Sequence, residues 1–165
     1  MRFTWATENV MQTRVESHSS CWLWHRAPSR LTQVCIVTDA TVAHTFEQVL
    51  SIRLGNSSQV AWLHLIDCAA THGEWLASRT HGQVHASRPE NTIEQAIAPL
   101  PCDCRLLLCS QEVAGLEWLG GVRGQQVFFA HDRPGANPET QANAVIATVE
   151  EILRASLTEK WGDSY

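Results

Sequence analysis

Four short apolar runs constrain the fold of this chain more than any other feature of its sequence. They are residues 34–38 (VCIVT), 60–66 (VAWLHLI), 105–109 (RLLLC) and 126–130 (QVFFA). Each run is almost continuously apolar and is followed by polar or turn residues. This pattern is typical of strands that are covered on both faces, as in a parallel sheet.

Helical patterns lie between and after these runs. Apolar residues at 42, 46, 49, 50 and 54 share one helix face, and shorter patterns cover residues 93–97 and 113–119. The segment 113–119 is expected to end at Gly120 and Gly121. A long last helix is expected over about residues 138–158, with Asn137 as its cap and Pro138 at its first position. The alternation predicts an α/β fold: a mainly parallel, five-stranded open sheet with helices on both faces.

The sequence pattern does not decide the structure of two regions. Residues 68–79 are compatible with a short helix or a loop, and residues 82–87 (GQVHAS) with a lesser edge strand. Residues 3–7 and 21–25 have strand-like composition, which indicates a hairpin or an extra strand added to the α/β core. We therefore expect a single domain over 1–165, with an extension at 1–30, the core at 31–158 and a polar tail at 159–165.

Charge and cysteine content narrow the function. The 12 basic and 17 acidic residues give a net charge of −5, which disfavours a nucleic-acid partner. The longest apolar runs are far shorter than a membrane span, and the first ten residues lack a secretion signal. Two of the six cysteines lie in apolar strand-like runs, so buried free thiols in a reducing cytoplasm are expected.

The end of the first apolar run carries the first candidate site. Asp39 and Thr41 follow this buried strand directly. In open α/β sheets, ligands bind outside the carboxyl ends of the strands, where the strand order switches. The alternative is a helix-capping turn, because Asp, Ser and Thr favour that position.

The other candidates are each set against a structural alternative. His64 and Cys68, with Asp67 beside them, are candidates for a cysteine–histidine pair in nucleophilic catalysis. The structural alternative is that His64 is a packed strand residue and Cys68 a small buried thiol. His72, His81 and His85 indicate a pocket-lining loop or an exposed polar one. We assign no catalytic residue.

Cysteines and tryptophans give the remaining candidates. Cys102 and Cys104, with Cys21 and His25, suggest zinc, but the C-x-C spacing is poor for it, so no metal site is assigned. Trp22 and Trp24 lie on one face of a predicted strand. They are either core residues or a surface patch for a dimer or another partner.

The order of elements resembles the universal stress protein family over about residues 32–133. VCIVTDAT is similar to that family's first strand and its "VDGS"-like turn, and VAWLHLID to its second strand. GQVHAS, CDCRLLLC and QQVFFAHD stand in the places of the third, fourth and fifth strands. The resemblance implies strand order 3-2-1-4-5, frequent homodimers and, in some members, bound ATP. Asp39 matches the first-strand aspartate that contacts the nucleotide in those members.

The phosphate-binding stretch departs from the family pattern. ATP-binding members carry Gly-x2-Gly-x9-Gly-Ser/Thr after the fourth strand. Here that strand leads into Ser110, and the Gly-x2-Gly is Gly121–Gly124, with no Gly-Ser/Thr following at the expected spacing. Glu112 adds negative charge there. We therefore expect a non-enzymatic interaction or regulatory module of the stress response, without a cofactor, that dimerises or binds a protein partner. The alternatives are an adenine-nucleotide-binding stress protein that binds ATP or a related nucleotide through Asp39, Thr41, Ser110, Gly121 and Gly124, and a small α/β enzyme with a His/Asp/Cys site.

Overall fold

A five-stranded sheet forms the centre of the molecule. The computed structural model describes residues 21–81, 93–130 and 136–162, with strands in the spatial order β1-β3-β2-β4-β5. The strands β2, β3, β4 and β5 are parallel, and β1 pairs antiparallel with β3. This confirms the α/β class and the mainly parallel sheet. The strand bounds are β1 Trp22–Arg26, β2 Val34–Asp39, β3 Val60–Leu65, β4 Arg105–Cys109 and β5 Val127–Phe129.

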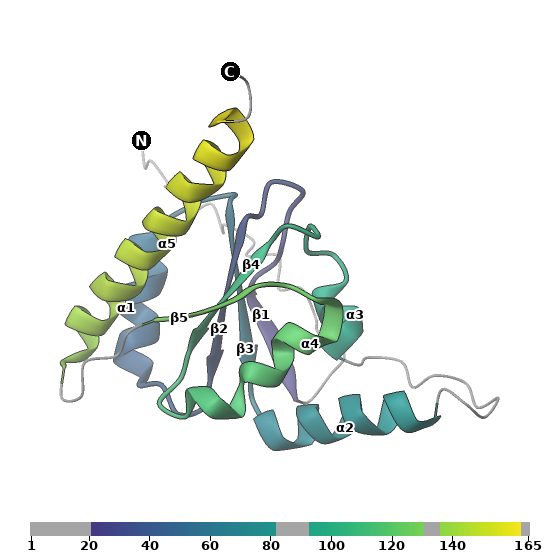
Figure 1. Ribbon diagram of the computed structural model, residues 1–165. Helices are drawn as coiled ribbons and strands as arrows, with labels where there is room; N and C mark the ends of the chain where they lie inside the picture. The colour runs from purple at the N-terminus through teal and green to yellow at the C-terminus, as the bar shows by residue number, and fades with distance from the viewer. Residues whose placement is uncertain (1–20, 82–92, 131–135, 163–165) are drawn as a thin grey trace, which may run out of the picture.

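Helices cover both faces of the sheet (Figure 1). Helices α1 (His44–Leu54) and α5 (Pro138–Gly162) lie side by side on one face. The other face carries α2 (Cys68–His81), α3 (Ile93–Ile97) and α4 (Gly120–Arg123), with the 3₁₀ turns η1 (Val113–Gly115) and η2 (Glu117–Leu119). None of the helices in the described part of the chain combines the length and apolar character that crossing a bilayer requires.

The two helical layers explain why the central strands read as unbroken apolar runs. Val34 and Ile36 of β2 pack toward α1 and α5, whereas Cys35 and Val37 pack into the core on the opposite face. All four side chains are completely buried. A strand with a core on each side has no position that favours a polar residue, so the alternation expected of a half-exposed strand disappears.

The strand that lies next to β3 at the sheet edge is not the one that the family resemblance implies. The parallel strands β3-β2-β4-β5 follow the implied order 2-1-4-5, but the edge beyond β3 is occupied by β1. The segment 82–87, expected as the third strand, lies outside the described residues. The extra strand expected near residues 21–25 is β1, and the strand-like segment 3–7 also lies outside the described residues.

Two helical expectations need correction, and one open segment is decided. The segment 68–79, compatible with a short helix or a loop, is helical, as α2. The segment expected as one helix over 113–119 forms η1 and η2, and Gly120 and Gly121 begin α4 instead of ending a helix. The last helix continues to Gly162, through part of the segment expected as a polar tail. Its start is as predicted, since the Asn137 side chain accepts a hydrogen bond from the Thr140 N–H at 2.8 Å.

Candidate functional site

The strand order reverses between β2 and β4, and the candidate site lies at the carboxyl ends of these two strands. From β2 the chain proceeds outward to β3 on one side, and β4 then pairs with β2 on the other side. Connections leave such a point in opposite directions and open a crevice beyond the strand ends. Asp39 ends β2, and Ser110 follows β4 directly.

Three predicted site residues meet at this point. The Ser110 hydroxyl donates to Asp39 Oδ2 at 2.6 Å, the Thr41 backbone N–H donates to Asp39 Oδ1 at 3.0 Å, and the Thr41 hydroxyl donates to the same oxygen. The two hydroxyls lie 3.1 Å apart. They also accept backbone N–H groups from the segment after β4: Gln111 donates to Thr41 Oγ1 at 3.0 Å and Glu112 to Ser110 Oγ at 2.9 Å.

The Asp39 carboxylate is engaged by hydrogen bonds within the protein. The residue is only 6% exposed, and its two oxygens accept three hydrogen bonds from Thr41 and Ser110. A buried carboxylate needs such partners to remain ionised at acceptable cost. Asp39 therefore joins the ends of β2 and β4. It does not cap the following helix, because the N-cap of α1 is Ala43, without a side-chain cap hydrogen bond.

The predicted glycines are not part of this arrangement. Gly121 lies in α4, and Gly124 ends α4 with φ of 74°, a conformation that favours glycine. Both precede β5 and lie near its start, where the Leu106 N–H of β4 donates to the Gln126 carbonyl. Ser110 follows the opposite end of β4. The structure thus separates Gly121 and Gly124 from Asp39, Thr41 and Ser110.

A cavity of about 180 Å³ opens beside Ser110, on the face covered by α1 and α5. Val42 and Phe46 come from α1 and the segment before it, and Ala144 and Val145 come from α5. The ends of β4 and β5 and the start of α5 complete the lining. The remaining lining residues are Cys109, Ser110, Gln111, Ala130, Ala136, Thr140 and Gln141.

The lining is apolar with a few neutral polar groups. The residues that the structure describes around this cavity include no lysine, arginine, histidine, aspartate or glutamate. Ser110, Gln111, Thr140 and Gln141 supply hydroxyl and amide groups at its rim. Convergent neutral hydrogen-bonding groups on an apolar wall are typical of sites for small uncharged molecules.

The proposed cysteine–histidine pair is not assembled. His64 lies on the α1 face of β3, where Thr38 Oγ1 is 2.9 Å from its Nδ1. Cys68 packs against the core on the opposite face, and its thiol donates to the Gly115 carbonyl. Burial also raises the pKa of Cys68, which disfavours a thiolate. Asp67 caps α2 by accepting the Ala70 N–H at 2.8 Å.

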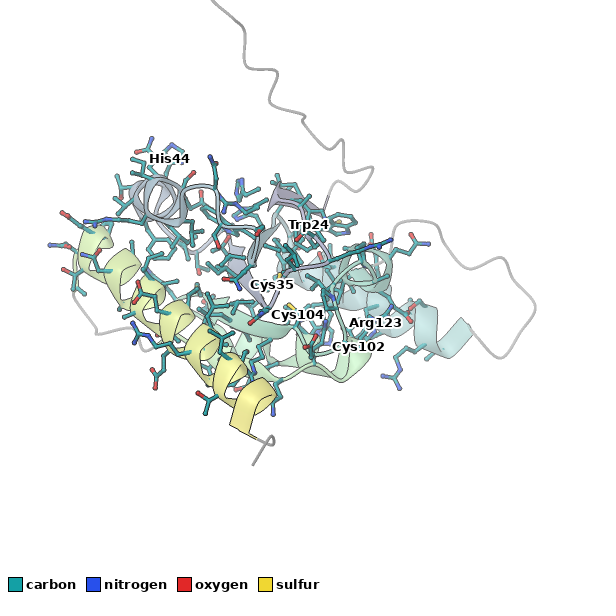
Figure 2. All side chains as sticks on the ribbon, turned by 90° about the horizontal axis from the view of Figure 1, so that it is seen from above. Trp24, Cys35, His44, Cys102, Cys104 and Arg123 are labelled. Carbon is teal, nitrogen blue, oxygen red and sulfur yellow. The ribbon has the colours of Figure 1, made fainter. Side chains whose placement is uncertain are left out.

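The cysteine zinc hypothesis fails for a similar reason. Burial raises the pKa of Cys104 to about 12, and Cys104 and Cys35 are neighbours in the interior (Figure 2). Cys102 is exposed, and the Cys21 thiol contacts Glu74 at 3.7 Å. The cluster that the structure does assemble from metal-ligating groups in its described residues is His25, Glu47 and His64, without a cysteine.

The other candidates belong to the α2 face. His72 stacks on Trp118, with ring centroids 4.6 Å apart, and Trp118 also packs against Trp75. Trp22 is buried in the same core and Trp24 is half-buried against it, which favours the core interpretation of this pair. The side chain of His81 and the whole of His85 lie outside the described part of the chain.

Comparisons of the chain with protein-family models, with curated proteins and with solved structures found no match. Function therefore has to follow from the residues and their geometry.

Proposed function

We propose that this chain is a non-catalytic binding and regulatory module, similar in kind to universal stress proteins, that holds a small uncharged ring system in the cavity beside Ser110. The observation that carries the proposal is the position of this cavity at the point where the strand order reverses, together with the neutral character of the described lining residues. Open α/β sheets bind ligands at this position.

Cavity size limits the ligand. The volume is about 180 Å³, and an engineered apolar cavity of about 150 Å³ holds benzene. One planar ring system therefore fits, with its polar atoms directed to Ser110 and the amides at the rim. A larger ligand would extend past the start of α5 into solvent.

The charge around the cavity limits the ligand further. A phosphate group is held by arginine, lysine or a row of free backbone N–H groups, and the described lining offers no such cation. The N–H groups of Gln111 and Glu112 already donate to Thr41 and Ser110. An uncharged ligand is therefore favoured over a nucleotide.

An adenine nucleotide is the second candidate. The spatial order β3-β2-β4-β5 agrees with the order that the family resemblance implies for its first, second, fourth and fifth strands. In this alternative adenine occupies the cavity and the phosphates lie outside it. The two candidates differ in whether the phosphates add to affinity.

The module is further proposed to act as a homodimer in a reducing cytoplasm. Support for the dimer comes from β5, which pairs with β4 on one side and carries Phe129 with 39% of its surface exposed. Support for the compartment comes from Cys35 and Cys104, which are buried in the interior and form no disulfide. Light scattering of the purified chain measures the oligomeric state directly.

The binding proposal is tested by NMR titration of the full chain with adenine, adenosine, ATP and neutral single-ring compounds. We expect adenine or a neutral ring compound to shift the signals of Ser110 and Ala144, and ATP to bind no more tightly than adenosine. ATP binding much more tightly than adenosine would favour the nucleotide alternative. No shift with any of these compounds would refute the proposal.

A matched pair of variants locates the ligand. Ala144→Leu adds three carbon atoms to the cavity lining, whereas Ala147→Leu makes the same change on the exposed side of α5. We expect Ala144→Leu to abolish binding and Ala147→Leu to leave it unchanged. Equal affinities for the two variants would place the ligand outside this cavity.

A further inference from the structure

Two imidazoles and one carboxylate converge where β1 and β3 face α1. His25 comes from β1, His64 from β3 and Glu47 from α1. Glu47 Oε1 lies 3.1 Å from His64 Nδ1 and 3.7 Å from His25 Nε2, and the three ligand atoms all lie within 4.8 Å of one another. The two imidazole rings have centroids 5.2 Å apart.

The strand β1 has an irregularity at His25, but its regular alternation is what directs this residue toward α1. Trp24 pairs with Leu63 and Arg26 with Trp62, so β1 advances two residues while β3 advances one. His25 is the extra residue of this bulge, and its ring packs at 4.7 Å from that of Trp62. Trp24, the residue before it, packs on the opposite face with α2, so regular alternation along β1 already places His25 on the α1 face.

The Glu47 carboxylate has the two imidazoles as close polar neighbours. Its Oε1 is buried, and in the described residues it contacts His64 Nδ1 and His25 Nε2. A buried carboxylate oxygen needs a cation or a hydrogen-bond donor at this position. Burial also lowers the pKa of His25 and of His64, which favours the neutral form of each ring that coordinates a metal.

We propose that His25, Glu47 and His64 bind one divalent transition-metal cation of the zinc class, with a fourth coordination position open to solvent. Two imidazoles and one carboxylate form a donor set that zinc uses with an open position. Tetrahedral zinc, with bonds of about 2.0–2.1 Å, needs ligand atoms about 3.3 Å apart. The separations of 3.1 and 3.7 Å are close to this value.

Binding requires one exchange of partners. In the described structure, Thr38 Oγ1 lies 2.9 Å from His64 Nδ1 and also accepts the Trp62 indole N–H at 2.9 Å. The cation replaces Thr38 at Nδ1, and the Trp62 hydrogen bond remains to hold the Thr38 hydroxyl. His44, the neighbouring histidine of α1, lies 3.8 Å from Glu47 Oε2, but it is 80% exposed and on the outer side of the helix (Figure 2), so we do not include it among the ligands of the cation.

The test is titration of the metal-depleted full chain with Zn²⁺, followed by calorimetry and by the NMR signals of the histidine side chains. We expect one tight site per chain and shifts at His25 and His64 on filling that site. Loss of a neighbour that only orients a ligand costs about 10–100-fold in affinity, so loss of a ligand should cost at least about 100-fold.

Variants separate this site from weak binding to surface histidines. Glu47→Gln keeps the side-chain shape and removes the charge, and Glu151→Gln is its matched control on an exposed position of α5. We expect Glu47→Gln to lose the tight site and Glu151→Gln to keep it. His25→Gln, at the sheet edge, gives the same test if Glu47→Gln does not fold.

Two results would overturn the assignment: a wild-type chain without a tight site, or Glu47→Gln and His25→Gln chains that bind Zn²⁺ as the wild type does. The cavity variant Ala144→Leu should leave the Zn²⁺ affinity unchanged, because Ala144 is not among the residues around the cation. The metal site and the cavity can therefore fail independently.

Discussion

Replacing Ser110 by alanine tests whether the network between β2 and β4 stabilises the fold. The substitution removes the donor to Asp39 Oδ2 at 2.6 Å and the acceptor for the Glu112 N–H at 2.9 Å. A hydrogen bond to a charged group contributes about 1.5–3 kcal/mol. The Asp39 oxygen is buried, so water does not replace the lost donor. We therefore expect the free energy of unfolding to fall by about 2–3 kcal/mol.

Urea unfolding followed by tryptophan fluorescence measures this change. With a slope of about 2 kcal/mol per M, the midpoint should fall by roughly 1 M. Ser51→Ala, on an exposed position of α1, is the matched control and should stay within about 0.5 kcal/mol of the wild type. If Ser110→Ala unfolds at the same urea concentration as Ser51→Ala, the network does not hold the two strand ends together.

Two further predictions concern a buried thiol and a helix cap. Burial raises the pKa of Cys104 to about 12 from an ordinary value of 9.0, so the unfolded thiol ionises first and stability should fall as the pH rises from 9.0 toward 12. Urea unfolding on either side of pH 9.0 checks this, and Cys104→Val should weaken the dependence while the exposed Cys102→Val does not. Asn137→Ala should cost about 1 kcal/mol in thermal unfolding because it removes the cap of α5. Asn143→Ala, on an exposed position of the same helix, should not.

The central strands could be predicted closely from the sequence. The runs at 34–38, 60–66 and 105–109 correspond to β2, β3 and β4 within one residue at each end. The reason is physical: both faces of these strands are buried, so apolar residues are continuous and end where the backbone leaves the core. Residues 113–123 were harder because two 3₁₀ turns and one helical turn have no sustained period of 3.6 residues.

The network at the strand ends and the proposed metal cluster also differ in how far the sequence predicts them. Asp39, Thr41 and Ser110 could be anticipated because the carboxyl ends of adjacent parallel strands meet at one edge of the sheet. The cluster of His25, Glu47 and His64 could not. Its members come from an antiparallel edge strand, a helix and a central strand, and the sequence pattern does not show that β1 pairs with β3 beside α1.

The position of β1 fixes an order of assembly during synthesis. β1 leaves the ribosome before β3, yet Leu23 pairs with His64, about 40 residues later in the chain. Until β3 has been made, β1 has no partner strand. The unit β2-α1-β3 is local in sequence and can form early, whereas contacts between distant segments form slowly. The first of these strands to be made thus waits for a partner that is made later, at the edge of the β2-α1-β3 unit.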